Sequence, residues 1–392
     1  MNNLFIRFLG QTSPTPLAIE IERAEGIYLY SPNGKRYIDL ISGVSVSNVG
    51  HSNPYIVNAV CEQAKKYMHL MVYGEMIQSP QIAIAQKIAK YLPEGMENVY
   101  LVNSGSEAIE GALKLAKRYT SRRQLISCRN AYHGSTSGAL SIMGSEYYKN
   151  SFRPLLPDVA QIEFNDISSL TEITEKTAAV VIEPIQGEAG YQIATSEFLC
   201  SLRKKCDETG ALLIFDEIQT GFGRTGEMFA WQKLGVAPDI ICMAKAMGGG
   251  MPIGGFAAKA EVMTTLTFNP VLGHITTFGG HPVCAAAGVA AMEYIENNNL
   301  TAQIEAKSQL FVDRLSACKG VKEIRRCGLM IAVDFHDEQR RDKVVRRAVE
   351  AGVITEGFLF CQTALRVAPP LIITEDEINQ CCDILLDAAN ID

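Results

Sequence analysis

Apolar positions along the middle of the chain follow two alternating patterns. In stretches such as residues 56–68 and 106–120, apolar side chains recur every three or four residues, which is the period of an amphipathic helix. Between such stretches lie short, nearly continuous apolar runs that are typical of buried strands. These runs cover residues 98–103, 178–185, 211–217 and 239–244. Strands that alternate with helices in this way predict βαβ units and a mostly parallel sheet.

Both ends of the chain depart from this alternation. Near the N-terminus, two short strand patterns flank Pro32-Asn33-Gly34, which predicts a hairpin. After about residue 297 the pattern changes to helices with a few short strands. We therefore expect an α/β protein with a large domain at residues 51–285. The N-terminal segment, 1–50, is expected to join the C-terminal part, 286–392, in a smaller α+β domain.

The composition narrows the classes of function. Of the 392 residues, 47% are hydrophobic and 20% are charged, which is the ordinary balance of a globular protein. The net charge of −7, without a basic run, argues against a nucleic-acid partner. No apolar run reaches the roughly 18 residues of a membrane-spanning helix, and no signal peptide is recognisable. Because the 11 cysteines include no CxxC pair, we expect reduced thiols, no metal site and a cytoplasmic protein.

Several predicted strands end in residues that suit a ligand, and in open α/β sheets ligands bind at the carboxyl ends of the strands. After the strand that ends at Asn103, the small residues Ser104, Gly105 and Ser106 lead into a helix. Free N–H groups at the start of that helix, together with serine hydroxyls, can hold a phosphate. The same segment is also explained as an ordinary helix cap, because serine is a favoured capping residue.

An acid and a lysine follow two other strands. Asp216 ends the run Leu212–Phe215, where a carboxylate can hold a cofactor ring nitrogen, bind a metal or begin a polar loop. Lys245 follows the run Asp239–Met243 and precedes a run of three glycines. Burying a lysine ammonium is costly unless it is paired or its charge is removed, for example in a Schiff base. A lysine that reaches the surface is the alternative, and the glycines, which permit close backbone approach, argue against it.

Two ring-bearing residues complete a combination that suits one cofactor. Tyr132 and His133 lie in a glycine-rich turn, where Tyr132 offers a flat face for stacking and His133 is typical of a structural turn histidine. Taken singly, each of these features has an ordinary structural explanation. Together they match pyridoxal phosphate, which needs a lysine, an acid beside the pyridine nitrogen, a phosphate cradle and ring contacts. A dinucleotide is not indicated, because no GxGxxG opens a helix after the first strand.

Long motifs in a fixed order carry a resemblance to a known family. They are NSGSEAIEGALK, YHGST, VIEPIQGEAG, IFDEIQTGFGRTG, MAKAMGGGMPIG and TTFGGHP. With them, the sequence resembles the class III aminotransferases, the pyridoxal-phosphate enzymes that include the acetylornithine, ornithine and 4-aminobutyrate aminotransferases. The resemblance covers nearly the whole chain. It implies the fold-type I architecture, in which a large domain with a mostly parallel sheet is joined to a smaller α+β domain.

The resemblance implies roles for the cofactor-binding residues. Lys245 would bind the cofactor through a Schiff base and then move a proton between the substrate carbon and the cofactor, and Asp216 would pair with the pyridine nitrogen. The other implied contacts are those of Gln219 with the phenolic oxygen, Tyr132 with the ring face, and Gly105 and Ser106 with the phosphate. Thr277 would reach the phosphate from the neighbouring subunit, which makes a homodimer the minimal active unit.

Three further residues are implied to serve the substrates. Glu188 and Arg366 resemble the family's switchable pair, in which the glutamate masks the arginine while a terminal amine reacts. Once released, the arginine grips the α-carboxylate of glutamate or 2-oxoglutarate, for which a planar guanidinium is well suited. Thr276 falls where the family touches the substrate.

At four positions the sequence departs from the family pattern. Ser135 stands where an arginine commonly binds the distal carboxylate of the substrate, so a donor with a carboxylate at that end is not favoured. Val44 replaces a tyrosine of the ornithine enzymes, which argues against free ornithine. Ile275 and His281 replace a glycine and an asparagine near the dimer-side phosphate loop, and the sequence indicates no functional effect of these two replacements.

The sequence therefore predicts a pyridoxal-phosphate-dependent aminotransferase. It would transfer the amino group of a terminal amine, such as an acetylornithine-like donor, to 2-oxoglutarate by a ping-pong mechanism, with pyruvate as the alternative acceptor. A decarboxylase, an aminomutase or an amino-acid racemase of the same fold remains open, although Glu188 and Arg366 argue against these reactions. A non-catalytic binding protein that kept the fold is a further alternative, which Lys245, Asp216 and the phosphate loop disfavour.

Overall fold

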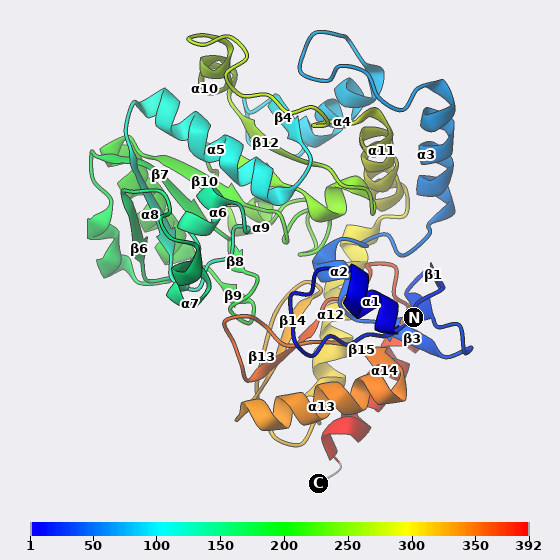
Figure 1. Ribbon diagram of the computed structural model, residues 1–392. Coiled ribbons are helices and arrows are strands. Elements are labelled where there is room, and N and C mark those ends of the chain that lie inside the picture. The colour runs from blue at the N-terminus through cyan, green and yellow to red at the C-terminus, as the bar shows by residue number, and fades with distance from the viewer. Residues whose placement is uncertain (1, 391–392) are drawn as a thin grey trace.

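A seven-stranded sheet forms the centre of the larger part of the molecule (Figure 1). The computed structural model describes residues 2–390, so residues 1, 391 and 392 of the expected small domain lie outside the described residues. The strands follow the order β4-β12-β11-β10-β7-β5-β6. Their bounds are Asn98–Val102 (β4), Gln124–Cys128 (β5), Val159–Ile162 (β6), Thr177–Ile182 (β7), Leu212–Asp216 (β10), Ile240–Met243 (β11) and Gly254–Ala258 (β12).

The pairing of these strands confirms the predicted mostly parallel sheet. From β11 to β6 every neighbouring pair runs parallel, whereas β12 is antiparallel to both β11 and β4. The four apolar runs that were predicted as strands correspond to β4, β7, β10 and β11. This mostly parallel sheet agrees with the expected α/β architecture of the large domain.

Apolar clusters cover both faces of this sheet. One face packs beneath α5 (Gly105–Thr120), and Ile214 belongs to that cluster. The opposite face packs beneath α8 (Ser196–Thr209), and the next residue along the strand, Phe215, belongs to that second cluster. Because both faces are covered, apolar side chains are needed at nearly every strand position. This requirement explains the continuous apolar runs, since burying each such side chain contributes about 1.5–3 kcal/mol.

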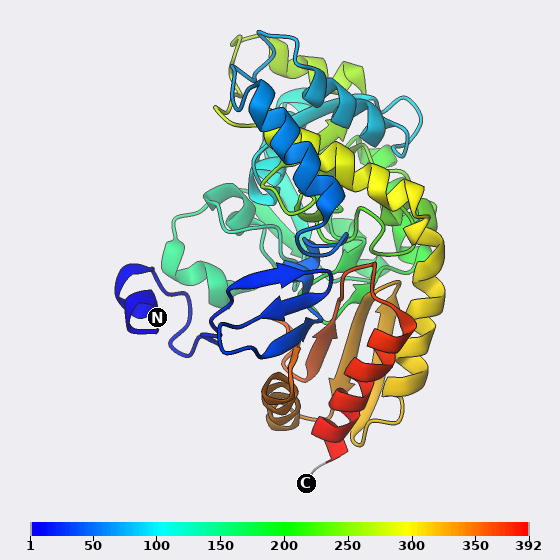
Figure 2. The same ribbon diagram turned by 90° about the vertical axis from the view of Figure 1, so that its right-hand side faces the viewer.

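The two ends of the chain form a smaller part of the molecule (Figure 2). Strands β2 and β3 form the hairpin predicted around Pro32-Asn33-Gly34, and β15 pairs parallel with β3, so N- and C-terminal segments share one sheet. A second, three-stranded sheet has the order β13-β14-β16. The bounds of these strands are Arg23–Glu25 (β1), Tyr28–Tyr30 (β2), Arg36–Asp39 (β3), Val321–Cys327 (β13), Met330–Phe335 (β14), Val353–Ile354 (β15) and Ala364–Val367 (β16).

Long helices pack around both parts. They are Pro54–Lys66 (α3), Ser79–Ala89 (α4), Pro282–Asn297 (α11), Leu300–Leu315 (α12), Glu338–Ala351 (α13) and Glu375–Asn390 (α14). The expected boundary after residue 285 falls inside α11, and the domain limits remain predictions. Among the helices within residues 2–390, none is long and apolar enough to cross a membrane.

Short 3-10 helices cover Asn150–Phe152, Ile167–Glu172, Lys245–Gly248 and Thr264–Thr267. The other short elements complete the described chain. They are Asn2–Phe8 (α1), Ser42–Ser45 (α2), Ser137–Ser141 (α6), Glu146–Lys149 (α7), Ile185–Gln186 (β8), Gln192–Ile193 (β9), Ala230–Leu234 (α9) and Ala260–Met263 (α10). The loops that follow β4, β5, β7, β10 and β11 meet around one cavity of about 450 Å³. This cavity lies at the carboxyl ends of the parallel strands, where a ligand site is expected in an open α/β sheet.

Candidate active site

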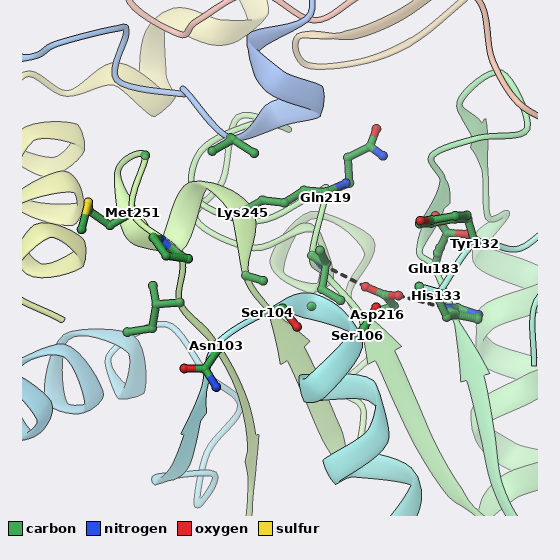
Figure 3. A pocket seen from close by; sticks show the side chains of 18 residues that line it. Asn103, Ser104, Ser106, Tyr132, His133, Glu183, Asp216, Gln219, Lys245 and Met251 are labelled. Atoms are coloured by element: carbon green, nitrogen blue, oxygen red, sulfur yellow. Dashed lines mark hydrogen bonds and ion pairs between the residues drawn. The ribbon is translucent and has the colours of Figure 1, made fainter. Parts of the chain in front are cut away.

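Lys245 lies in the wall of this cavity, just beyond the end of β11 (Figure 3). Its backbone is left-handed, with φ of +50°, which is uncommon for a residue other than glycine. The side chain is partly buried, and within residues 2–390 its ammonium has no hydrogen bond or ion pair. Burial lowers the pKa of the Lys245 ammonium, although the charge of Glu188 opposes this shift. The cavity thus contains an amine without a hydrogen-bond or ion-pair partner among the described residues, and its pKa lies below the ordinary lysine value.

Asp216 is the last residue of β10 and is buried. Its Oδ2 lies 2.7 Å from Nδ1 of His133, and its Oδ1 accepts a hydrogen bond from the Ile218 N–H at 3.1 Å (Figure 3). Burial by itself would lower the pKa of His133, but the hydrogen bond and the charge of Asp216 raise it above its ordinary value. His133 therefore orients the Asp216 side chain, and a carboxylate in this position can hold a protonated ring nitrogen.

Glu183 is a site residue that the sequence did not single out. It is buried beyond the end of β7, and its two oxygens accept hydrogen bonds from the N–H groups of Tyr132 and Gly187, both at 2.8 Å. Burial raises the pKa of Glu183 to about 7, against the opposing charge of His133. The only available sequence signal was an acid at the end of a predicted strand, the same signal that identified Asp216. Glu183 joins the turn that carries Tyr132 to the loop that leads to Glu188.

The start of α5 combines the two explanations that the sequence left open. Ser104 caps the helix, because its Oγ accepts a hydrogen bond from the Glu107 N–H at 3.2 Å. Gly105 and Ser106, the first two residues of the helix, line the cavity. A Cβ on Gly105 would lie 2.9 Å from the Cδ1 of Ile218, so only glycine fits there without movement. Unpaired N–H groups at this helix start can hold a phosphate.

Tyr132, Gln219 and Ser135 lie around the same space. Tyr132 and Gln219 line the cavity, and Tyr132 is partly buried. Ser135 is exposed, with its Oγ 3.4 Å from the Tyr132 hydroxyl and its N–H donating to Ser106 Oγ at 3.3 Å. Ser135 therefore stands beside the predicted phosphate and ring-binding residues, and it places no charge there.

Glu188 and Arg366 form a buried ion pair, as the resemblance implied. Arg366 comes from β16 and Glu188 from the turn between β8 and β9. The Arg366 Nη2 lies 2.7 and 2.8 Å from the two carboxylate oxygens of Glu188, and its Nη1 lies 3.5 Å from Gln219 Oε1. Burial would lower the pKa of Arg366, but Tyr191 and Glu188 raise it, so the guanidinium stays charged. Gln219 lines the cavity and thus connects the ion pair to the cavity wall.

Two rings and a second acid surround this guanidinium. The Arg366 Cζ lies 4.6 Å from the ring centre of Phe358 and 5.6 Å from that of Tyr191. Glu356 lies 3.6 Å from its Nε. Only 1% of Arg366 is exposed, so the charge depends on these neighbours for stabilisation. Glu188 is the closer of the two carboxylates that balance this charge, and Glu356 remains beside the guanidinium if Glu188 moves.

Thr276 and Thr277 do not line the cavity of their own chain. Thr276 Oγ1 accepts a hydrogen bond from the side-chain amide of Asn103 at 2.8 Å, and Asn103 lines the cavity. Thr277 is exposed, and its carbonyl lies 2.8 Å from Nε2 of His69. In a single chain, Thr276 is therefore one residue removed from the cavity, and Thr277 faces outward.

The remaining departures from the family pattern also lie outside the cavity lining. Val44 belongs to the turn Ser42–Ser45, and its φ of +60° is strained for a β-branched residue. Val46, directly after this turn, does line the cavity. Ile275 is exposed, and His281 lies at the start of α11. Val44 is thus the one of these three that stands close to the cavity in sequence.

Taken together, the residues fit pyridoxal phosphate chemically. An unpaired amine can condense with an aldehyde, a buried aspartate can hold a protonated pyridine, and a helix start can bind a phosphate. The buried arginine can bind a carboxylate once its own glutamate withdraws.

Comparison with known proteins agrees with this fit. Residues 10–389 match the sequence profile of a family described as "Aminotransferase class-III". The acetylornithine aminotransferase of Archaeoglobus fulgidus is 39% identical over 370 residues, which are 94% of this chain and 95% of the relative. The [LysW]-aminoadipate semialdehyde/glutamate semialdehyde transaminase of Sulfolobus acidocaldarius is 36% identical over 372 residues, 94% of each chain.

A solved structure shows the same fold with the cofactor. An amine transaminase from an uncultivated Pseudomonas species, in its PLP-bound form, superimposes with a TM-score of 0.90 at 26% identity. The match covers 98% of each of the two chains.

Proposed function

The chain belongs to the class III aminotransferases, which use pyridoxal phosphate, and from this we propose that it transfers the amino group of a terminal amine to 2-oxoglutarate. The transfer would take place in two half-reactions with one substrate in the site at a time, which gives ping-pong kinetics. The contact between Glu188 and Arg366 carries this proposal. A single site must accept an amine that presents no carboxylate beside its nitrogen and then a 2-oxo acid that does.

The surroundings of Glu188 suit a switch between these two states. The Arg366 guanidinium is buried, and leaving such a charge without a partner costs several kcal/mol. The α-carboxylate of an incoming 2-oxo acid can replace Glu188 as that partner, so the charge balance is kept. Glu188 is also held by the backbone N–H groups of Leu359, at 3.2 Å from its Oε2, and of Phe360, at 3.0 Å from its carbonyl oxygen. This backbone contact gives the displaced glutamate a fixed pivot.

We assign the chemistry to residues of the cavity. Pyridoxal phosphate supplies an aldehyde that condenses with amines and a ring that withdraws electrons from the substrate carbon. Lys245 Nζ holds the cofactor between turnovers and, when free, takes up and returns the proton of the substrate carbon; its lowered pKa favours the neutral amine that this task needs. Asp216, oriented by His133, holds the ring nitrogen. The remaining cofactor contacts are assigned to Gly105, Ser106, Tyr132 and Gln219.

The cavity favours a donor without a carboxylate at its far end. Among the described residues that line it, Lys245 is the one lysine or arginine, and Ser135 at the rim is uncharged. The similarity to acetylornithine aminotransferases supports a terminal amine on an acetylornithine-like chain. Serine at position 135 indicates that the far end is neutral, cationic or bound by other means than an arginine at this position.

We also propose that the active unit is a homodimer in which Thr277 reaches the cofactor phosphate of the partner and Thr276 lies at the substrate side. Thr277 is exposed and does not line its own cavity. Exposed apolar side chains surround its loop, among them Phe278, 54% exposed, and Val271, 72% exposed. Burying such side chains against a second copy would favour association.

Initial rates with both substrates varied test the proposed reaction. We expect parallel lines in double-reciprocal plots and one glutamate formed for each donor consumed. Lys245→Ala, which lacks the amine, is the matched control and should lose the activity by at least about 100-fold. A decarboxylase, an aminomutase or a racemase would consume no 2-oxoglutarate. That result, or full activity of Lys245→Ala, would exclude the proposal.

A further inference from the structure

His281 caps helix α11 through a ring nitrogen. Its Nδ1 accepts a hydrogen bond from the Val283 N–H at 3.3 Å, at the first turn of the 16-residue helix Pro282–Asn297. An accepting Nδ1 carries no proton, so this cap exists only in the neutral form of the ring. Protonation would remove the acceptor and place a positive charge at a helix start, where the helix dipole disfavours it. An asparagine cap has neither limitation.

His69 holds the same loop from the opposite direction. It lies beyond the end of α3, and its Nε2 lies 2.8 Å from the carbonyl oxygen of Thr277, to which an N–H at that position donates. Its ring centre is 4.9 Å from that of Phe278 and 5.7 Å from that of His281. The loop between Thr276 and α11 is therefore bound by His69 at Thr277 and ends at His281, and the rings of these two histidines are neighbours.

The charges around His281 are few. His69 is the one charged or titratable neighbour that shifts the pKa of His281. Two neutral side chains also bind the loop: Gln81 Nε2 donates to the Gly280 carbonyl at 2.9 Å, and the Asn103 amide donates to Thr276 Oγ1 at 2.8 Å. Burial and the proximity of His69 lower the pKa of His281 below its ordinary value. The folded loop therefore favours the neutral ring. Its stability is fully present above the ordinary histidine pKa of about 6.5 and weakens as the pH falls through it.

We propose that His69 and His281 are positioning residues that hold the loop Thr276–His281 so that Thr277 is presented to the partner's cofactor phosphate. The inference rests on the proposed function, because it requires the homodimer and the phosphate contact of Thr277. Protonation of His281 loosens this loop and weakens the grip on the cofactor, while Gln81 keeps the loop attached. Cofactor binding in this chain is thereby made sensitive to pH at a position where an asparagine would leave it insensitive.

The test measures the dissociation constant of pyridoxal phosphate by absorbance titration of apoenzyme at pH 7.5 and at pH 5.5. When the pH falls from 7.5 to 5.5, the dissociation constant should increase in the wild type by a factor about five times larger than in His281→Asn, whose cap does not titrate. His69→Phe keeps the ring contact and loses the donor, so it should bind the cofactor more weakly already at pH 7.5. His336→Asn, an exposed histidine after β14, is the matched control and should follow the wild type.

The outcomes separate this inference from the proposed function. Protonation of the cofactor itself affects the wild type and every variant equally, so it does not contribute to the difference between their pH dependences. Equal pH dependence of the wild type and His281→Asn, or wild-type affinity in His69→Phe at pH 7.5, would overturn the inference. The proposed function fails by a different result, the absence of 2-oxoglutarate consumption by the wild type at pH 8, which leaves the binding titrations measurable.

Discussion

Three acids at the strand ends show how the neighbours of a residue decide its role. Asp216, Glu217 and Glu183 are all buried. Asp216 faces the cavity and is bound to His133, whereas Glu183 faces it and accepts two backbone N–H groups. Glu217 points away from it and accepts hydrogen bonds from the N–H groups of Ala230 and Trp231 and from the Thr220 hydroxyl. The first two belong to the site, and Glu217 instead stabilises the start of α9.

Glu217→Gln should remove a pH dependence of stability. Burial raises the pKa of Glu217 to about 7, so the folded state favours the protonated acid and loses stability as the pH rises through that value. Between pH 5 and pH 8 the wild type should lose about 2–3 kcal/mol of unfolding free energy relative to the variant. Urea unfolding at the two pH values measures this difference. A constant difference between the two proteins would show that Glu217 is not buried as a neutral acid.

Ser135→Arg should widen the range of donors. A guanidinium at this exposed position beside Tyr132 can bind a distal carboxylate, and a charge-assisted hydrogen bond contributes about 1.5–3 kcal/mol. We therefore expect kcat/KM for 4-aminobutyrate to rise by about tenfold or more. Ser137 is an exposed serine of the same segment. Ser137→Arg adds the same charge at a different position and should leave kcat/KM for 4-aminobutyrate unchanged. Unchanged or lower turnover of 4-aminobutyrate in Ser135→Arg would contradict the proposal that the far end of the donor lies beside position 135.

At the residue scale, much of the site was predictable from the sequence. Lys245, Asp216 and the phosphate loop follow apolar runs, and such runs reveal strand ends. The structure brings these residues together, and it places Glu188 against Arg366 as the resemblance implied. Their assigned roles remain proposals. His133 and Glu183 could not be recognised as site residues, because their positions depend on contacts between segments far apart in the chain.

At the scale of elements, burial explains which predictions succeeded. The long apolar runs became β4, β7, β10 and β11, because a sheet covered on both faces needs such runs. Short elements were predictable where a local signal marks them, as in the hairpin of β2 and β3, but their bounds depend on contacts with distant residues. Helix α9 has five residues, and the Glu217 carboxylate at the end of β10 binds the first N–H groups of that helix. The antiparallel β12 likewise has no signal in its composition, since direction in a sheet depends on the path of the connecting loops.

At the scale of the whole molecule, the site joins both parts of the chain. Asp216 ends β10 and Lys245 follows β11 of the large sheet, whereas Arg366 comes from β16 of the smaller part. The proposed carboxylate-binding arginine and the proposed cofactor-binding residues thus come from different sheets, and Arg366 is bound to Glu188 by an ion pair. The sequence could not place these sheets relative to each other, because that arrangement depends on packing between distant segments.

This arrangement leads to the central claim that Arg366 serves only the 2-oxo acid. The two half-reactions should therefore respond differently to a change at that position. Arg366→Lys keeps the positive charge and loses the planar fork that matches a carboxylate. The lost charge-assisted hydrogen bonds should slow the reaction of 2-oxoglutarate by about 30-fold, and the reaction of the terminal amine should change by less than about threefold.

Stopped-flow absorbance of the bound cofactor, with each half-reaction started separately, is the most direct measurement of this claim. The wild type and Arg366→Lys would be compared first with the amine donor alone and then, after the amino group has been loaded, with 2-oxoglutarate alone. A selective loss in the second step is the result that we predict. Equal slowing of both steps, or an unchanged rate with 2-oxoglutarate, would show that the buried Glu188–Arg366 pair is a structural contact and that the acceptor is bound elsewhere.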